Sequence, residues 1–463
     1  MEEVKYDEIH RQLRDSCRKQ SIIVGRGGGA LFCESPDLWD SKEVLEAVFG
    51  FDKFRPMQKE VISCVMSGRD TLAVMPTGGG KSLCYQLSAI LMGGLTIVIS
   101  PLIALMRDQV AKLRPRLEPL GMDAFALHGD LSPEAYGKSC QQIEACCEKG
   151  KCVILYISPE ALSGQRLRRL LNGIRTHVKQ IVVDEAHCIS EWGHDFRPDY
   201  LEIGKIRGNF PQANCLALTA TATRVVRQDI IRQLRLDRPE ILIGNFDRPN
   251  IYIEVRKRQR SLSQIEDFLA GHTGECGIIY CFSRREADGI AEKLRSRGIS
   301  ITSYHAGLSD WERTERQRNW LSGSIRIMAA TVAFGMGIDK CDVRFVIHTS
   351  LPRSIEEYYQ EIGRAGRDGR QSDALLLFSP GDASKIRYFF KGKEDTVQAE
   401  IQLQEIMRFA AGKTCRRKSI LSYFGQSSPL LRTDGIIPPV RCCDVCARMV
   451  SPPARGMYRI KDA

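Results

Sequence analysis

A glycine-rich stretch, residues 76–82 (Pro-Thr-Gly-Gly-Gly-Lys-Ser), has the residue types needed to hold a phosphate chain. The apolar run before it, residues 71–75, predicts a buried strand, and the residues after it predict a helix. Glycines let a backbone bend sharply and point successive N–H groups at an anion, and a helix N-terminus adds partial positive charge. The residues expected to bind the phosphates are Thr77, Gly78, Gly79, Gly80, Lys81 and Ser82.

Two residues of this stretch have individual roles. Lys81 would reach the β- and γ-phosphates, and the Ser82 hydroxyl would complete a Mg²⁺ shell. The strict phosphate-loop pattern has Gly or Ala where this chain has Met75. A flexible turn is the alternative interpretation, and the predicted strand and helix on either side argue against it.

A pair of carboxylates, Asp184 and Glu185, follows the apolar run 180–183, and His187 comes two residues later. A carboxylate at the C-terminal end of a strand, facing a phosphate loop, is where a nucleotide-bound Mg²⁺ is held. We expect Asp184 to orient the water shell of the metal and Glu185 to position or deprotonate the attacking water. An acidic helix N-cap would explain one carboxylate, but not two followed by a histidine.

The elements that must position these residues belong to a chain of 463 residues, long enough for two or three domains. The net charge of +11 slightly favours a polyanion partner. Seventeen cysteines scattered through apolar runs indicate a reducing compartment. Apolar runs stop short of membrane-spanning length, and no N-terminal signal pattern is visible, so we expect no membrane association.

Two series of apolar, β-branched runs alternate with helical patterns, which predicts βαβ units and parallel sheets. Residues 246–250 separate the two series, and residues 256–260 (Arg-Lys-Arg-Gln-Arg) have the composition of an exposed connector. Beyond residue 71, the expected strands are 95–99, 153–157, 180–183 and 215–218, then 277–281, 325–329, 343–347 and 374–378.

Several motifs in order resemble those of superfamily 2 helicases, and in particular of the RecQ family. Asp-Glu-Ala-His at 184–187 accompanies the phosphate loop, and further matches lie at 100–109, 219–221, 330–337 and 360–369. The resemblance runs from about residue 45 to 446. It implies an α/β fold with two RecA-like parallel-sheet domains in tandem plus a small helical zinc-binding subdomain. The expected boundaries are a peripheral segment 1–40, helicase domains 41–245 and 246–382, the zinc-binding subdomain 383–450 and a tail 451–463.

The resemblance also assigns roles around the nucleotide. Residues Phe51, Arg55 and Gln58 match the segment that reads adenine, with ordinary core packing as the alternative for Phe51. Gln360, Arg364 and Arg367 match the sixth helicase motif, and the two arginines share a face if that segment is helical. By resemblance Arg367 acts as an arginine finger on the γ-phosphate.

Residues 190–198 resemble the aromatic-rich loop of the family. Trp192 and Phe196 would stack on bases, and His194 and Arg197 would touch phosphate or relay to the ATPase. An aromatic pair in the core is the alternative, although the glycine, proline and charged residues around it favour the DNA-binding interpretation.

Cys415, Cys442, Cys443 and Cys446 resemble the ligands of the family's zinc subdomain. A Cys-x-x-Cys pair with a distant cysteine is a structural zinc pattern. The departure is Cys442, which is adjacent to Cys443, and adjacent cysteines have difficulty occupying two corners of one tetrahedron. Two outcomes stay open: a distorted four-cysteine site, or three cysteines with water or another side chain.

The resemblance thus implies a monomeric ATP-dependent 3′→5′ DNA helicase that uses ATP, Mg²⁺ and Zn²⁺. Its partners would be single-stranded and forked DNA, with other DNA repair proteins, in the nucleus if eukaryotic or the cytoplasm and nucleoid if bacterial. Because the chain ends soon after Cys446, we expect it to lack winged-helix and further C-terminal domains. A DNA-stimulated translocase or annealing factor and a non-enzymatic scaffold are the alternatives; intact Lys81, Asp184, Glu185 and Arg367 argue against the scaffold.

Overall fold

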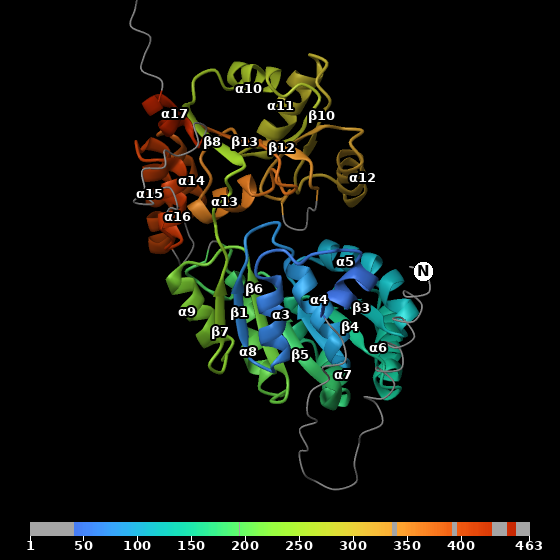
Figure 1. Cartoon of the computed structure of the whole chain (residues 1–463). Coiled ribbons are helices and arrows are strands. Elements are labelled where there is room, and N and C mark those ends of the chain that lie inside the picture. Colours follow the sequence, from blue (N-terminus) through green and yellow to red (C-terminus); the bar gives the residue numbers. More distant parts are fainter. Residues whose placement is uncertain (1–40, 194, 336–339, 391–395, 428–441, 451–463) are drawn as a thin grey trace, which may run out of the picture. The chain divides into compact units, whose positions relative to one another are not determined.

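The computed structural model describes residues 41–193, 195–335, 340–390, 396–427 and 442–450. The chain divides into two compact units, Met1–Asn245 and Phe246–Ala463 (Figure 1). No helix in the described ranges combines the length and apolar character needed to cross a membrane.

The first unit is built on a seven-stranded parallel sheet with strand order β3-β4-β2-β5-β6-β1-β7. Its central strands are buried on both faces, as crossover helices on both sides of a parallel sheet require. The strands are β1 (Thr71–Val74), β2 (Leu95–Ile99), β3 (Asp123–Leu127), β4 (Val153–Ile157), β5 (Val178–Val183), β6 (Asn214–Thr219) and β7 (Glu240–Ile243). The helices are α2 (Ser41–Val44) with a π-turn (Leu45–Phe49), α3 (Gln58–Met66), α4 (Lys81–Met92), α5 (Ile103–Leu117), α6 (Pro133–Glu148), α7 (Gln165–Gly173), α8 (Leu201–Arg207) and α9 (Arg224–Gln233), with 3₁₀ turns at Glu118–Leu120, Pro159–Ser163, Arg175–His177, Ala186–Ile189 and Pro198–Tyr200.

The second unit has a six-stranded parallel sheet with order β10-β11-β9-β12-β13-β8. Figure 1 shows its last four helices, in red, gathered beside β8. The strands are β8 (Ile251–Lys257), β9 (Cys276–Tyr280), β10 (Ile301–Tyr304), β11 (Ile327–Ala330), β12 (Val343–His348) and β13 (Ser372–Phe378). The helices are α10 (Ser261–Ala270), α11 (Arg284–Arg295), α12 (Asp310–Leu321), α13 (Ile355–Ile362), α14 (Asp382–Phe390), α15 (Thr396–Ala411), α16 (Arg416–Tyr423) and α17 (Asp444–Val450).

The predicted fold class is confirmed, and each predicted strand is present within three residues of its expected bounds. The prediction of an exposed connector at 256–260 is wrong for its first two residues. Arg256 and Lys257 complete β8, whose core-facing positions are Ile251, Ile253 and Val255. The arginine tolerates this position because its guanidinium pairs with Glu254 outside the core.

Candidate nucleotide, DNA and zinc sites

The phosphate loop has the predicted strand-loop-helix form, since β1 ends at Val74 and α4 begins at Lys81. Gly78 and Gly80 adopt φ of 82° and 75°, a left-handed conformation that favours glycine. Met75, the departure from the strict pattern, is buried with its sulfur 3.8 Å from Cys84 Sγ. The methionine therefore packs into the core behind the loop.

Three neighbouring strands end at this edge of the sheet. The order β5-β6-β1 places Asp184 after the first, Thr219 at the end of the second and the phosphate loop after the third. Met75 N donates to Thr219 O at 2.9 Å, and Lys81 Nζ lies 3.6 Å from Glu185 Oε1. The predicted lysine and carboxylates are thus brought together.

A short polar chain continues from Glu185. His187 Nδ1 lies 3.5 Å from Glu185 Oε2 and 2.9 Å from Thr219 Oγ1. Glu185 itself adopts φ of +46°, which is strained for a residue with a side chain. Such strain is concentrated at functional sites, and here it aims the carboxylate at both the lysine and the histidine.

Asp184 is buried, and this burial, together with the neighbouring Glu185 charge, raises its pKa to about 6, although Lys81 opposes the shift. Glu185 N donates to Asp184 Oδ1 at 3.0 Å. A buried carboxylate beside a phosphate loop has the oxygen donors that Mg²⁺ prefers, so Asp184 and Ser82 fit the predicted metal.

The segment expected to read adenine contacts the phosphate loop. Gln58 is buried, its Oε1 accepts from Arg55 N at 2.7 Å, and its Nε2 donates to Gly80 O at 3.0 Å and Gly79 O at 3.3 Å. The Arg55 guanidinium donates to Gly78 O. Both ends of the Gln58 amide are therefore engaged by protein.

Two aromatic side chains predicted to contact ligands lie at the surface. Phe51 is 48% exposed and Trp192 is 49% exposed, so core packing does not account for either. Phe196 is half-buried, and His194 lies outside the described residues. Arg197 donates to Asp195 Oδ2 at 3.1 Å and to Pro101 O at 3.2 Å, which ties the loop to the segment after β2.

The sixth motif lies in the second unit. Helix α13 carries Gln360 and ends at Ile362, so Arg364 and Arg367 lie in the turns that follow and the condition for a shared helical face is not met. Left-handed Gly366 (φ +59°) packs closely against Asn250 and Ser372. Arg364 is buried and donates to Gly335 O, whereas Arg367 is half-buried.

The four predicted zinc ligands come together at the start of α16 and the start of α17. Their sulfurs all lie within 4.8 Å of one another, with Cys415 Sγ 3.6 Å from Cys442 Sγ and 3.9 Å from Cys443 Sγ. A tetrahedral site with Zn–S bonds of about 2.3 Å separates its sulfurs by about 3.8 Å. Cys442 therefore occupies a position a zinc ligand needs, although it is adjacent to Cys443, and the donor set fits Zn²⁺.

Two charged residues that were not predicted from the sequence hold this cluster together. Arg416 and Asp444 are buried and paired at 2.9 Å, linking the helix after Cys415 to the helix after Cys443. Arg417 is also buried, 3.3 Å from Asp247 and donating to Ile251 O at 3.1 Å. The signal was present, because two arginines follow Cys415 directly and an aspartate follows Cys443.

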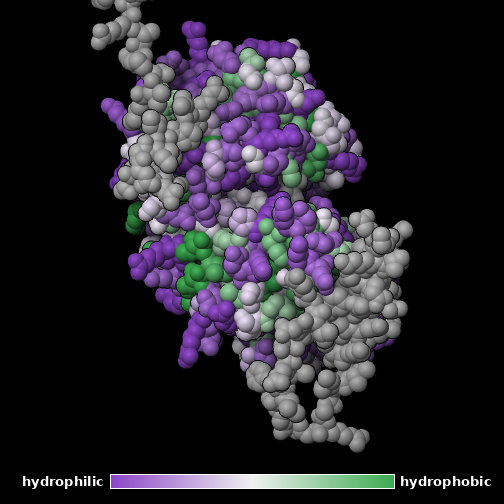
Figure 2. Space-filling view, in the orientation of Figure 1, coloured by the Kyte–Doolittle hydropathy of each residue, from purple (hydrophilic) through white to green (hydrophobic). Residues whose placement is uncertain are grey.

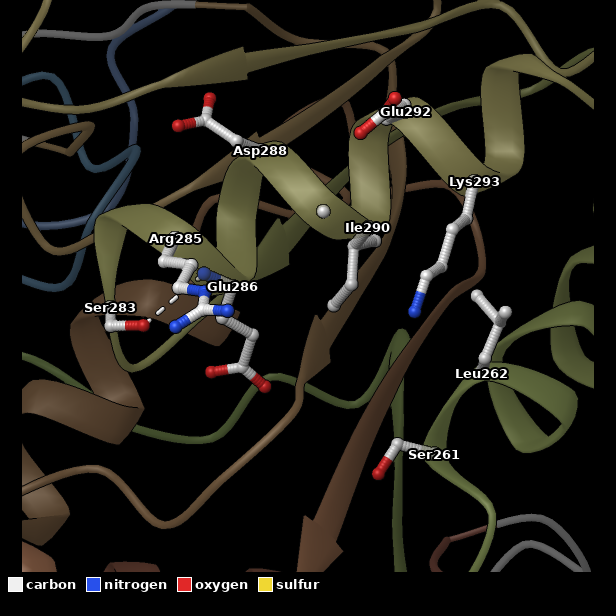
Figure 3. Close-up of a pocket in the computed structure, with 10 residues that line it drawn as sticks. Ser261, Leu262, Ser283, Arg285, Glu286, Asp288, Ile290, Glu292 and Lys293 are labelled. Atoms are coloured by element: carbon white, nitrogen blue, oxygen red, sulfur yellow. Dashed lines mark hydrogen bonds between the residues drawn. The ribbon is translucent and has the colours of Figure 1, made fainter.

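A hollow of about 870 Å³ lies elsewhere, between the start of α10 and most of the length of α11 (Figure 3). Ser261, Glu286 and Lys293 are among its lining residues, and Figure 3 shows them around one open space. Its lining includes none of the site residues predicted from the sequence. The residues predicted to bind the phosphates and Mg²⁺ lie instead at the ends of β5 and β1 in the first unit.

Comparisons with known proteins agree with this arrangement. Family models match at residues 55–229 (DEAD/DEAH box helicase), 260–369 (helicase conserved C-terminal domain) and 380–447 (RecQ zinc-binding). Among solved structures, the chain resembles the DUF1998 helicase MrfA bound to DNA and AMPPNP (TM-score 0.62, 19% identity, 85% of this chain and 59% of that one). It also resembles the DEAD-box helicase Mss116 bound to ssRNA (TM-score 0.61, 17% identity, 74% of each chain).

Curated relatives are closer in sequence. The chain is 43% identical over 418 residues to the ATP-dependent DNA helicase RecQ of Pasteurella multocida, covering 90% of this chain and 63% of that one. It is 42% identical to hus2/rqh1 of Schizosaccharomyces pombe, covering 88% and 31%. The chain thus spans less than two thirds of the length of these relatives. The three family models follow one another in the order of the two sheets and the cysteine cluster. Together with these relatives, they support assignment of the chain to the RecQ family of helicases.

Proposed function

We propose that this chain hydrolyses ATP and uses the energy to move along single-stranded DNA and unwind duplexes, with 3′→5′ polarity, in DNA repair and recombination. The observation that carries the proposal is the set of contacts at the ends of β5, β6 and β1. Lys81 and Glu185 are 3.6 Å apart, and His187 links Glu185 to Thr219. Relatives at about 43% identity are named ATP-dependent DNA helicases.

The residues divide the chemistry among them. The backbone of residues 77–80 and the Lys81 ammonium would hold the phosphates, while Ser82 and Asp184 would hold Mg²⁺, which supplies charge stabilisation for phosphoryl transfer. Glu185 would position the attacking water, with His187 fixing its carboxylate. Gln360, Arg364 and Arg367, in the second unit, would contribute to ATP hydrolysis. Trp192 and Phe196 would contact the bases, with Arg197 and His194 near phosphate.

A strand-displacement assay on 3′-tailed and 5′-tailed duplexes, with ATP turnover measured in parallel, tests the proposal. We expect ATP-dependent displacement of the 3′-tailed substrate and none by the matched Glu185→Gln variant. Turnover stimulated by single-stranded DNA without displacement would favour the translocase or annealing alternative. DNA binding with no turnover at all would favour the scaffold.

A further inference from the structure

The edge strand β7 (Glu240–Ile243) differs from the other edge strands in the described part of the chain. Its exposed side chains are Ile241, 46% exposed, and Ile243, 40% exposed. At the matching edge of the second sheet, β8 carries Tyr252, Glu254 and Arg256 at its outward positions, and a bridge from Ile253 to Cys443 covers part of the strand. The remaining edge strands, β3 and β10, are largely buried.

The backbone of β7 is also open. Glu240 N donates to Asp70 O and Gly244 N donates to Val74 O, so this set of alternate residues faces β1. Because residues along a strand alternate in direction, the N–H and C=O groups of Ile241 and Ile243 point away from the sheet. No described residue pairs with these groups. An edge with free donors and acceptors is a template for another strand.

Proteins usually protect such an edge with lysine or another charge on the strand. Here the two open positions both hold isoleucine, a residue that packs well against a neighbouring strand. Figure 2 shows a green apolar patch over α9 and β7, bordered by purple. Leu242, the residue between Ile241 and Ile243, packs instead against the buried core of the first unit.

Two arginines mark one end of the strand. Arg235 and Arg238, in the turn between α9 and β7, are exposed, with φ of +52° and +40°. No described carboxylate forms an ion pair with either guanidinium, whereas nearby Arg232 pairs with Asp229 and Arg69 pairs with Glu240. Asp237, between the two arginines, is also exposed, so the start of the open edge carries a net positive charge that is smaller than the two arginines alone would give.

We propose that β7 is a docking site for an extended peptide segment of a partner protein. That segment would add as an eighth strand, place β-branched side chains over Ile241 and Ile243, and bring acidic residues to Arg235 and Arg238. Strand addition obtains its affinity from main-chain hydrogen bonds and its specificity from alternate side chains. A second copy of this chain fits less well, because Arg235 and Arg238 outnumber Asp237, the exposed carboxylate between them, so two such edges would repel each other.

The test uses the full chain and a fluorescein-labelled peptide, Glu-Glu-Val-Thr-Val-Thr-Val, with binding followed by fluorescence anisotropy. Two control peptides replace the glutamates by lysines or methylate alternate backbone nitrogens. We expect both controls to bind at least tenfold more weakly. The peptide should also slow hydrogen exchange at the amides of Ile241 and Ile243.

Variants separate the two parts of the proposal. Ile241→Lys with Ile243→Lys should lose peptide binding, and Arg235→Glu with Arg238→Glu should reverse the preference between acidic and basic peptides. Leu321→Lys, which adds a lysine at another exposed apolar position, should bind normally. All three should keep the thermal midpoint and ATP turnover of the parent. Equal binding of all three peptides would overturn the proposal, as would peptide binding that the Ile241→Lys, Ile243→Lys double variant leaves unchanged. Self-association of the parent chain that this double variant abolishes would also overturn it.

Discussion

The fourth zinc ligand can be decided by comparing Cys442→Ser with Cys443→Ser. The structure places Cys442 Sγ 3.6 Å from Cys415 Sγ, and Cys443 Sγ 3.9 Å from the same atom. Both distances match the edge of a zinc tetrahedron, about 3.8 Å. The two substitutions should therefore weaken zinc binding to a similar extent, whereas a three-cysteine site would make Cys442→Ser nearly silent.

The size of the effect follows from the number of ligands. Structural zinc sites are worth about 10–16 kcal/mol near neutral pH, so one of four thiolates accounts for about 3 kcal/mol. That corresponds to roughly 100-fold in affinity. Because zinc also links α16 to α17, both variants should unfold at lower temperature than the parent.

The assay is competition with a chromogenic chelator, together with metal analysis of freshly purified protein and a thermal melt. Cys341→Ser is the matched control, since Cys341 is exposed and lies outside the cluster. We expect one zinc per chain in the parent and in the control. A Cys442→Ser affinity within about threefold of the parent, beside a large loss in Cys443→Ser, would refute the four-cysteine site.

Three further predictions concern the nucleotide and DNA sites. Lys81→Ala should lose nucleotide affinity, whereas Glu185→Gln should bind ATP but fail to hydrolyse it. Binding of a fluorescent ATP analogue and ATP turnover, measured side by side, check this. Substantial turnover in Glu185→Gln would contradict the role of Glu185 in positioning the attacking water. Trp192→Ala, at a 49% exposed position, should leave the melting temperature and DNA-free ATP turnover unchanged. It should weaken the stimulation of turnover by single-stranded DNA about tenfold, since stacking is worth about 1–3 kcal/mol per base. Phe196→Ala, at a half-buried position, is expected to show the same loss of stimulation, and a lowered melting temperature would instead indicate core packing. The pKa of Asp184, raised to about 6, means that this carboxylate is ionised above pH 6 and protonated below it. The Mg²⁺ concentration for half-maximal nucleotide binding should therefore rise about tenfold from pH 7 to pH 5. Circular dichroism checks that the fold is kept, and a Mg²⁺ requirement that does not change with pH would contradict the role of Asp184 as a metal ligand.

Most of the first sheet could be predicted because its central strands are buried on both faces. Such strands are continuous apolar runs, and residues 95–99 and 153–157 were predicted with the bounds that β2 and β4 have. The strands that were missed lack this signal. β3 holds an aspartate and two alanines, β10 contains threonine and serine, β8 alternates apolar with polar or charged residues, and β7 has four residues after a proline.

The candidate site likewise has features that could be predicted from the sequence and features that could not. The phosphate loop and the Asp184–Glu185 pair follow apolar strands directly, so their meeting at one sheet edge could be predicted from the order of elements. The directions of side chains could not. Nothing in the sequence shows that the Gln58 amide is held by the phosphate loop, or that Arg364 is buried against Gly335 O. Such contacts depend on residues that are far apart along the chain.

The placement of the aromatic loop suggests how DNA and ATP could affect one another within the first unit. Arg197 N donates to Cys188 O at 2.9 Å, in the same 3₁₀ turn as His187, and the Arg197 side chain reaches Pro101 O. Trp192 therefore lies on a short exposed loop that begins beside His187 and is tied down at Arg197. Because His187 contacts both Glu185 and Thr219, a shift of the loop on binding a base would reach Glu185, the carboxylate proposed to position water, through very few residues. Coupling through so short a path requires the rigid strand ends beneath it, which agrees with the proposed placement of the chemistry on central strands and of the DNA contact on a loop.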